Sequence, residues 1–147
     1  MRALVQPISM CGGPATEWTI PQAAAAEPYR VLVPHDGLAE LSSMTHIWKC
    51  SGTGIVEQFS SGINVIQAVN DSPNPAASWA ALAAADPTTT SVGTVRGQPA
   101  ALIDPGNGAN GSVTVVDAGV WMVVEGNGKI PITTLQRVTN SLQPTSS

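Results

Sequence analysis

The sequence predicts an α+β domain: a curved antiparallel β-meander sheet with one inserted short helix and a C-terminal helix packed on one face. From residue 29 onward, short runs of β-branched and aromatic residues alternate with turn residues. Connections between the central runs are too short for a parallel crossover, which needs a dozen residues or more. Two segments with helical features, 76–85 and 132–142, interrupt and end the series of strands, as in α+β domains.

The first half of the domain reads as four strands. The opening strand, Tyr29–Val33, is closed by Pro34, and three further strands follow it: Met44–Cys50, Gly54–Phe59 and Ile63–Val69. Three-residue connections join these last three strands, so we expect an antiparallel meander.

The inserted helix is predicted over 76–85. Asn74 can cap it, Pro75 suits the first helical position and Pro87 ends it. Trp79, Leu82 and Ala83 lie at helical spacing, which favours core contacts over a binding role for the tryptophan.

The second half is predicted to contain further strands and a last helix. The strands are Ser91–Val95, Pro99–Ile103, Ser112–Val116 and Val120–Glu125, and the helix is Ile132–Leu142. The loop Gly106–Gly111 matches the G-x-G-x-x-G pattern of dinucleotide-binding proteins. It leads into a strand and not into a helix, so it indicates a loop between strands.

The proline-rich segment 1–28 shows no sustained hydrophobic period, so we expect an N-terminal arm or linker there. The segment 29–143 is then a single α+β domain, and 144–147 is expected to be a disordered tail.

Composition excludes several classes of protein. The chain of 147 residues is 43% hydrophobic and 11% charged, so a packed core is expected. A net charge of −4 without any basic run argues against nucleic acid as a partner. No apolar run is long enough to cross a membrane.

Cys11 and Cys50 are the only cysteines, which is too few for a four-ligand zinc site. A disulfide between them would close a loop of about 40 residues, worth about 4 kcal/mol in the chain-entropy model. Two separate thiols are the alternative. Few lysines, an acidic pI and the possible disulfide favour an extracytoplasmic location, periplasmic, cell-surface or secreted, with an export segment missing from this chain.

Candidate binding residues come from the sparse aromatic side chains. Strand alternation places Trp48, His46 and Met44 on one sheet face, where Phe59 can pair across the hairpin. These residues, with Trp121, either belong to the core or line an apolar sheet face that accepts a ligand or peptide. Neither His46 nor His35 has a partner at metal-ligand spacing, and we assign no metal ligand, cofactor or catalytic residue.

The second half also resembles a known family. The segments Val95–Ile103, Ser112–Gly126 and Ile132–Leu142 are similar to the end of extracytoplasmic bacterial domains found on lipoproteins and at the outer ends of anti-sigma factors. Tyr29–Pro34 is similar to that family's opening strand. The resemblance implies a lipoprotein-carrier and RseB-like fold, a curved antiparallel sheet with helices on its concave side, and it carries no catalytic residues.

These observations predict a non-enzymatic extracytoplasmic binding or sensing domain that holds a protein partner or an apolar ligand on its sheet face. One alternative is a structural subunit of a phage or cell-surface assembly that uses its N-terminal arm. A second alternative is a small hydrolase, which would bring two of the ten carboxylates together in a cleft.

Overall fold

A computed structural model describes residues 5–8, 13–34, 43–50, 52–70, 74–106 and 108–144, with the backbone alone for 5–8. The strands of these ranges are β1 (Val5–Ile8), β2 (Gly13–Trp18), β3 (Leu32–Val33), β4 (Met44–Lys49), β5 (Ile55–Phe59), β6 (Ile63–Val69), β7 (Thr90–Val95), β8 (Gln98–Ile103), β9 (Gly111–Asp117), β10 (Val120–Gly126) and β11 (Gln143–Pro144). The helices are α1 (Ile20–Ala26), α2 (Pro75–Ala85) and α3 (Ile132–Ser141).

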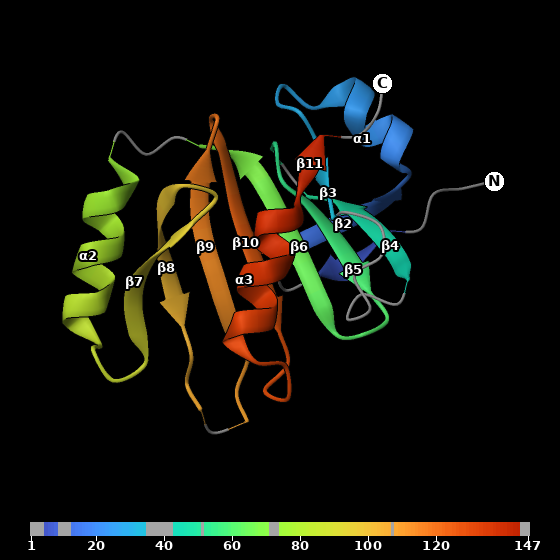
Figure 1. The fold of residues 1–147 in the computed structure, drawn as a ribbon. Coiled ribbons are helices and arrows are strands. Elements are labelled where there is room, and N and C mark those ends of the chain that lie inside the picture. Colours follow the sequence, from blue (N-terminus) through green and yellow to red (C-terminus); the bar gives the residue numbers. More distant parts are fainter. Residues whose placement is uncertain are drawn as a thin grey trace.

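Nine of the described strands form one open sheet in the order β1-β2-β4-β5-β6-β10-β9-β8-β7, and every neighbouring pair is antiparallel. The sheet consists of two meanders joined where β6 pairs with β10 (Figure 1). Outside this sheet, β3 and β11 form a separate two-stranded pair. The predicted α+β class with an antiparallel sheet, an inserted helix and a C-terminal helix is therefore confirmed.

The main core lies between the sheet and α3, which crosses the sheet in front of β9 and β10 (Figure 1). Side chains that alternate along the central strands meet one face of the helix, as the 3.6-residue period requires. Those that are fully buried in this core are Ile63, Val65, Val113, Val115, Met122, Val124, Leu135 and Val138. We call this side of the sheet the α3 face and the opposite side the back face.

On the α3 face, the N-terminal half of the sheet is covered by the chain that leads from β2 to β3. Thr19 and Gln22 form a reciprocal capping box that starts α1. Ala23 of this helix and Val31 pack on Ile55 of β5, together with the rings of Trp18 and Tyr29. The covering segment therefore completes the core where α3 does not reach.

These observations correct the expected boundary at residue 29. Residues 1–28 were expected to form an arm or linker, but β1 and β2 are strands of the main sheet and α1 packs against it. The predicted strand Tyr29–Val33 is only Leu32–Val33 in the structure. Of the expected tail, Pro144 pairs with Leu32, and residues 145–147 lie outside the described ranges.

The inserted helix α2 has the cap predicted for it, because the Asn74 side chain accepts a hydrogen bond from the backbone N–H of Ala77. It contacts β7 and β8 at one end of the sheet (Figure 1). Trp79 is buried as expected. Leu82 is 47% exposed, so the prediction that Leu82 contacts the core is wrong.

Two hairpins of the second meander use two-residue turns in which both central residues have positive φ. Arg96 and Gly97 have φ values of 56° and 73°, and Ala118 and Gly119 have 51° and 79°. This pattern defines the type I′ turn, whose twist matches that of the flanking strands. Ala118 adopts a conformation that costs residues with a side chain about 1–2 kcal/mol.

We therefore expect Ala118→Gly to raise the free energy of unfolding by roughly 0.5–1 kcal/mol, because relief of the left-handed strain exceeds the entropy that glycine adds to the unfolded chain. Urea unfolding measures the change. Ala81→Gly in the exposed part of α2 is the control, since it should lower stability by about 1 kcal/mol. If both variants lose the same free energy of unfolding, the argument for strain at Ala118 is contradicted.

Candidate functional site

A pocket of about 500 Å³ lies on the α3 face where the two meanders meet. Its walls come from three separate parts of the chain: the segment before β3, the ends of β6 and β10 with the β9–β10 turn, and the β7–β8 turn with β11. The lining residues are Pro28, Tyr29, Arg30, Leu32, Val69, Arg96, Asp117, Ala118, Gly119, Val120 and Pro144. Its volume is within the range of small-molecule sites, about 300–1,000 Å³.

The first wall is held by Gln67, a fully buried side chain on β6. Its amide accepts a hydrogen bond from the Leu32 backbone N–H at 2.7 Å and donates one to the Leu32 carbonyl at 2.8 Å. One side chain thus satisfies both main-chain groups of Leu32, as a neighbouring strand would. This pairing fixes the distance between the segment 28–32 and the sheet.

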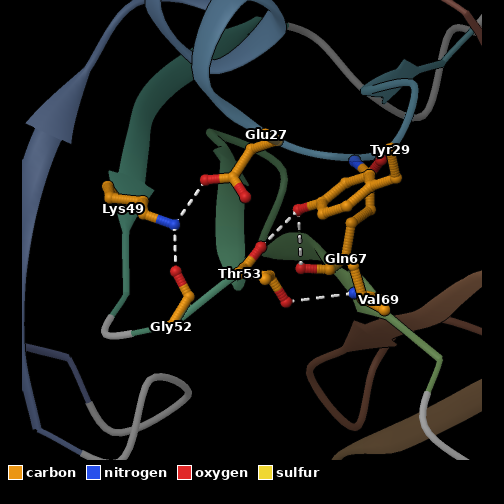
Figure 2. A network of polar contacts seen from close by, with 7 residues as sticks. All are labelled: Glu27, Tyr29, Lys49, Gly52, Thr53, Gln67 and Val69. Atoms are coloured by element: carbon orange, nitrogen blue, oxygen red, sulfur yellow. Dashed lines mark hydrogen bonds and ion pairs between the residues drawn. The ribbon is translucent and has the colours of Figure 1, made fainter.

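Tyr29 anchors the same wall from the other side (Figure 2). Its hydroxyl donates to the Thr53 carbonyl at 2.7 Å and lies 3.2 Å from the Gln67 carbonyl. Burial raises the pKa of Tyr29, and the nearby carboxylates of Glu27 and Glu57 add to the shift. The phenol therefore remains a neutral hydrogen-bond donor.

Lys49 ties the start of this wall to the sheet (Figure 2). Its ammonium group pairs with the Glu27 carboxylate and donates to the Gly52 carbonyl. The same ammonium group lies 5.5 Å from the centre of the Trp18 ring, within range of a cation–π interaction. Since the Glu27 side chain is 2% exposed, this ion pair is shielded from solvent.

Arg96 holds the second wall. Its Nε donates to Asp117 Oδ2 at 3.0 Å, and its Nη1 donates to the carbonyls of Thr139 and Leu142 at 3.1 and 2.6 Å. The backbone N–H of Arg96 donates to Asn140 Oδ1 at 2.8 Å. A cation at the C-terminus of α3 is favourable because the last helical carbonyls carry partial negative charge.

Arg30 differs from Arg96 in its environment. It is exposed, and no carboxylate of the described residues forms an ion pair with it. Among the described lining residues Asp117 is the only carboxylate, and Arg96 neutralises it. The pocket therefore combines an apolar floor, including the buried Leu32 and Val120, with one uncompensated positive charge.

Near the pocket wall, a carboxylic acid is fully buried. Glu57 on β5 is fully buried on the α3 face, between Ile47 and Val65 of the adjacent strands. Neither of its oxygens has a hydrogen-bond partner among the described residues. Burial raises its pKa well above 4.5, and the opposing effect of Gln67 is smaller because that amide is committed to Leu32. Glu57 does not line the pocket.

The four aromatic and histidine residues predicted to bind a ligand are not brought together. Trp48 and His46 lie on the back face, and Trp48 is 0% exposed, with its indole N–H bound to Gln58. A bulge between Met44 and His46 puts Met44 opposite Phe59, and Phe59 alternates with Glu57 onto the α3 face. The predicted stripe of Met44, His46, Trp48 and Phe59 on one face is therefore wrong.

Trp121 is partly buried on the back face of β10, three strands away from Trp48, or about 14 Å across the sheet. His46 instead contacts Glu17, with Nδ1 2.8 Å from the carboxylate oxygen, beside a hollow of about 140 Å³. Within the described ranges no cluster of three metal-ligating side chains occurs, and His35 lies outside them.

Cys50 is buried on the back face in a small cluster with Ala15, Trp48 and Val56. Cys11 lies outside the described residues. The disulfide between Cys11 and Cys50 stays a prediction.

Sequence reasoning missed the pocket because its walls come from segments that are distant in the chain. The sequence pattern places Tyr29 and Leu32 in one strand and leaves Arg96 between two others. The capping box at Thr19 and Gln22 was a readable signal of α1 and of structure before residue 29. No local pattern indicates that Gln67 of β6 pairs with Leu32.

Comparisons of the chain with protein-family models, with curated proteins and with solved structures find no match. The resemblance to the lipoprotein and anti-sigma-factor domains therefore stays a prediction. No helix in the described parts of the chain is long and apolar enough to span a membrane.

Glu57 makes stability depend on pH. Burial raises the pKa of Glu57 in the folded state. The contribution of Glu57 to the free energy of unfolding is therefore complete below the ordinary pKa of 4.5, and it is lost as the pH rises through the folded pKa. We expect Glu57→Gln to flatten this decline and to be more stable than the parent at neutral pH. Urea unfolding at a series of pH values tests this.

Glu125→Gln is the matched control, since Glu125 is a partly exposed carboxylate on the back face of β10. This variant should keep the pH dependence of the parent. A Glu57→Gln protein whose unfolding free energy follows the same pH curve as the parent would contradict the argument.

Proposed function

We propose that this chain is a non-enzymatic extracytoplasmic binding or sensing domain, and that its ligand occupies the pocket between the segment 28–32 and the β9–β10 turn. The observation that carries the proposal is the pocket itself, with its volume of about 500 Å³, an apolar floor and a few polar groups at its walls. Sites for small molecules have this character. The ligand class is a small apolar molecule.

The hydrogen bonds of both walls support a preformed site. Gln67 and Tyr29 fix one wall, and the four hydrogen bonds of Arg96 fix the other. A pocket whose walls are already ordered loses little conformational entropy when a ligand binds.

The aromatic sheet face is a weaker candidate. Trp48 is fully buried, and Phe59 packs in the core of the α3 face. This leaves Trp121 and His46 as separate, partly exposed side chains, which do not form a continuous apolar surface for a protein partner.

No observation favours the alternatives. The part of the pocket lining that the structure describes offers one carboxylate, Asp117, which is engaged by Arg96. A paired-carboxylate hydrolase needs two in one cleft. In a structural subunit, Trp18 and Ile20 of the N-terminal segment 1–28 would pack against a neighbouring copy. Trp18 instead packs within its own chain.

Naphthylmethanol, a neutral apolar probe, tests whether the pocket binds ligands. We expect one molecule to bind, with chemical-shift changes at Val69, Ala118 and Val120. Pro28→Trp and Pro144→Trp place large rings at exposed positions of the pocket wall, so at least one of them should abolish binding. Titration by fluorescence and NMR provides the measurement.

Pro87→Trp is the control for this experiment. Pro87 is also an exposed proline, but it lies in the turn after α2 and outside the pocket lining. This variant should bind as the parent does. Binding that is unchanged in both pocket variants, or absent from the parent, would refute the proposed site.

The extracytoplasmic part of the proposal rests on the predicted disulfide. We expect the protein, prepared in oxidising conditions, to be lighter than its reduced form by two hydrogen atoms, and alkylation of Cys11 and Cys50 to require a reductant. Intact-mass spectrometry measures both. Two thiols that react without reductant would contradict the disulfide.

A further inference from the structure

We propose that the pocket selects an apolar molecule that carries a single carboxylate, and that Arg30 binds this carboxylate. This inference rests on the proposed binding function and goes beyond it by naming the chemical class of the ligand. It is drawn from the charges of the pocket lining and from the contacts already made by each charged side chain.

Among the described residues, the lining contains three charged side chains: Arg30, Arg96 and Asp117. Arg96 and Asp117 form an ion pair with 3.0 Å between Nε and Oδ2, and their charges cancel. Arg30 has no carboxylate partner among the described residues. The described residues of the lining therefore carry a net charge of one positive unit.

Arg96 is poorly suited to bind the ligand. Its Nε and Nη1 already donate three hydrogen bonds, to Asp117 and to the carbonyls of Thr139 and Leu142. These contacts hold the Arg96 side chain at the C-terminus of α3, and Asp117 already balances its charge. Arg30 carries no such structural role in the described part of the chain, so its donors are available.

The position of the charge sets the orientation of the ligand. Arg30 is exposed, whereas Leu32 and Val120 of the same lining are 6% and 4% exposed. The polarity of the pocket therefore falls from its rim to its floor. A molecule with an apolar body and one anionic end matches this gradient, because the body is buried while the charge stays partly hydrated.

An arginine suits a carboxylate better than it suits a neutral group. The planar guanidinium presents a fork of N–H donors that matches two carboxylate oxygens. The chain as a whole carries a net charge of −4, which repels anions. Preference for an anion would therefore come from this local charge.

The test compares three probes with the same naphthalene ring: naphthoate, naphthylmethanol and naphthylmethylamine, which is protonated at neutral pH. We expect naphthoate to bind about tenfold more tightly than naphthylmethanol, and the ammonium probe to bind more weakly than either. Arg30→Gln should remove this advantage of naphthoate over naphthylmethanol.

Lys129→Gln is the matched control, because it removes one positive charge from an exposed residue in the β10–α3 connection, outside the pocket lining. It should keep the preference for naphthoate. Equal binding of naphthoate and naphthylmethanol to the parent, or an equal loss in both variants, would overturn the assignment of Arg30 while the binding site stands. Failure of all three probes to bind would instead refute the proposed function.

Discussion

The pairing of β6 with β10 is the constraint on which the rest of the molecule depends. Within the main sheet it joins the two meanders, over a seven-residue register from Ile63–Gly126 to Val69–Val120. The last of these pairs forms the floor of the pocket. Because Gln67 lies two residues earlier on β6, the same ladder also places the side chain that holds Leu32. The floor and the first wall of the pocket are thus positioned by one strand pair.

Local patterns were sufficient to predict most of the elements from β4 to α3. Alternation and short connections indicate the meanders, and the residues from Asn74 to Pro87 indicate α2. The elements before residue 29 were missed because Pro14 and Gly13 weaken the strand pattern of β2, and its pairing with β4 is a tertiary contact. The candidate site was misplaced because strand alternation was extended across a bulge in β4. Alternation predicts faces only within an unbroken strand, and the bulge before His46 reverses it.

Polar side chains inside this protein act in two different ways. Gln67 is fully satisfied, since its amide replaces the hydrogen bonds that a neighbouring strand would offer to Leu32. Glu57 is only one strand away and equally buried, yet neither oxygen has a partner among the described residues. Such a group lowers stability, because burial without hydrogen bonds has no compensation. The interior near the site therefore combines a specific polar contact with a destabilising one.

The placement of β6 and β10 also governs how the chain folds. The two strands are separated in sequence by residues 70–119, which contain α2 and three strands of the second meander. Until β10 is available, β6 is an edge strand with unpaired main-chain groups and apolar side chains, the kind of edge at which other chains add. Contacts between segments so far apart form slowly because a long loop must close first. The N-terminal meander is therefore open to aggregation until the C-terminal third of the chain has been made.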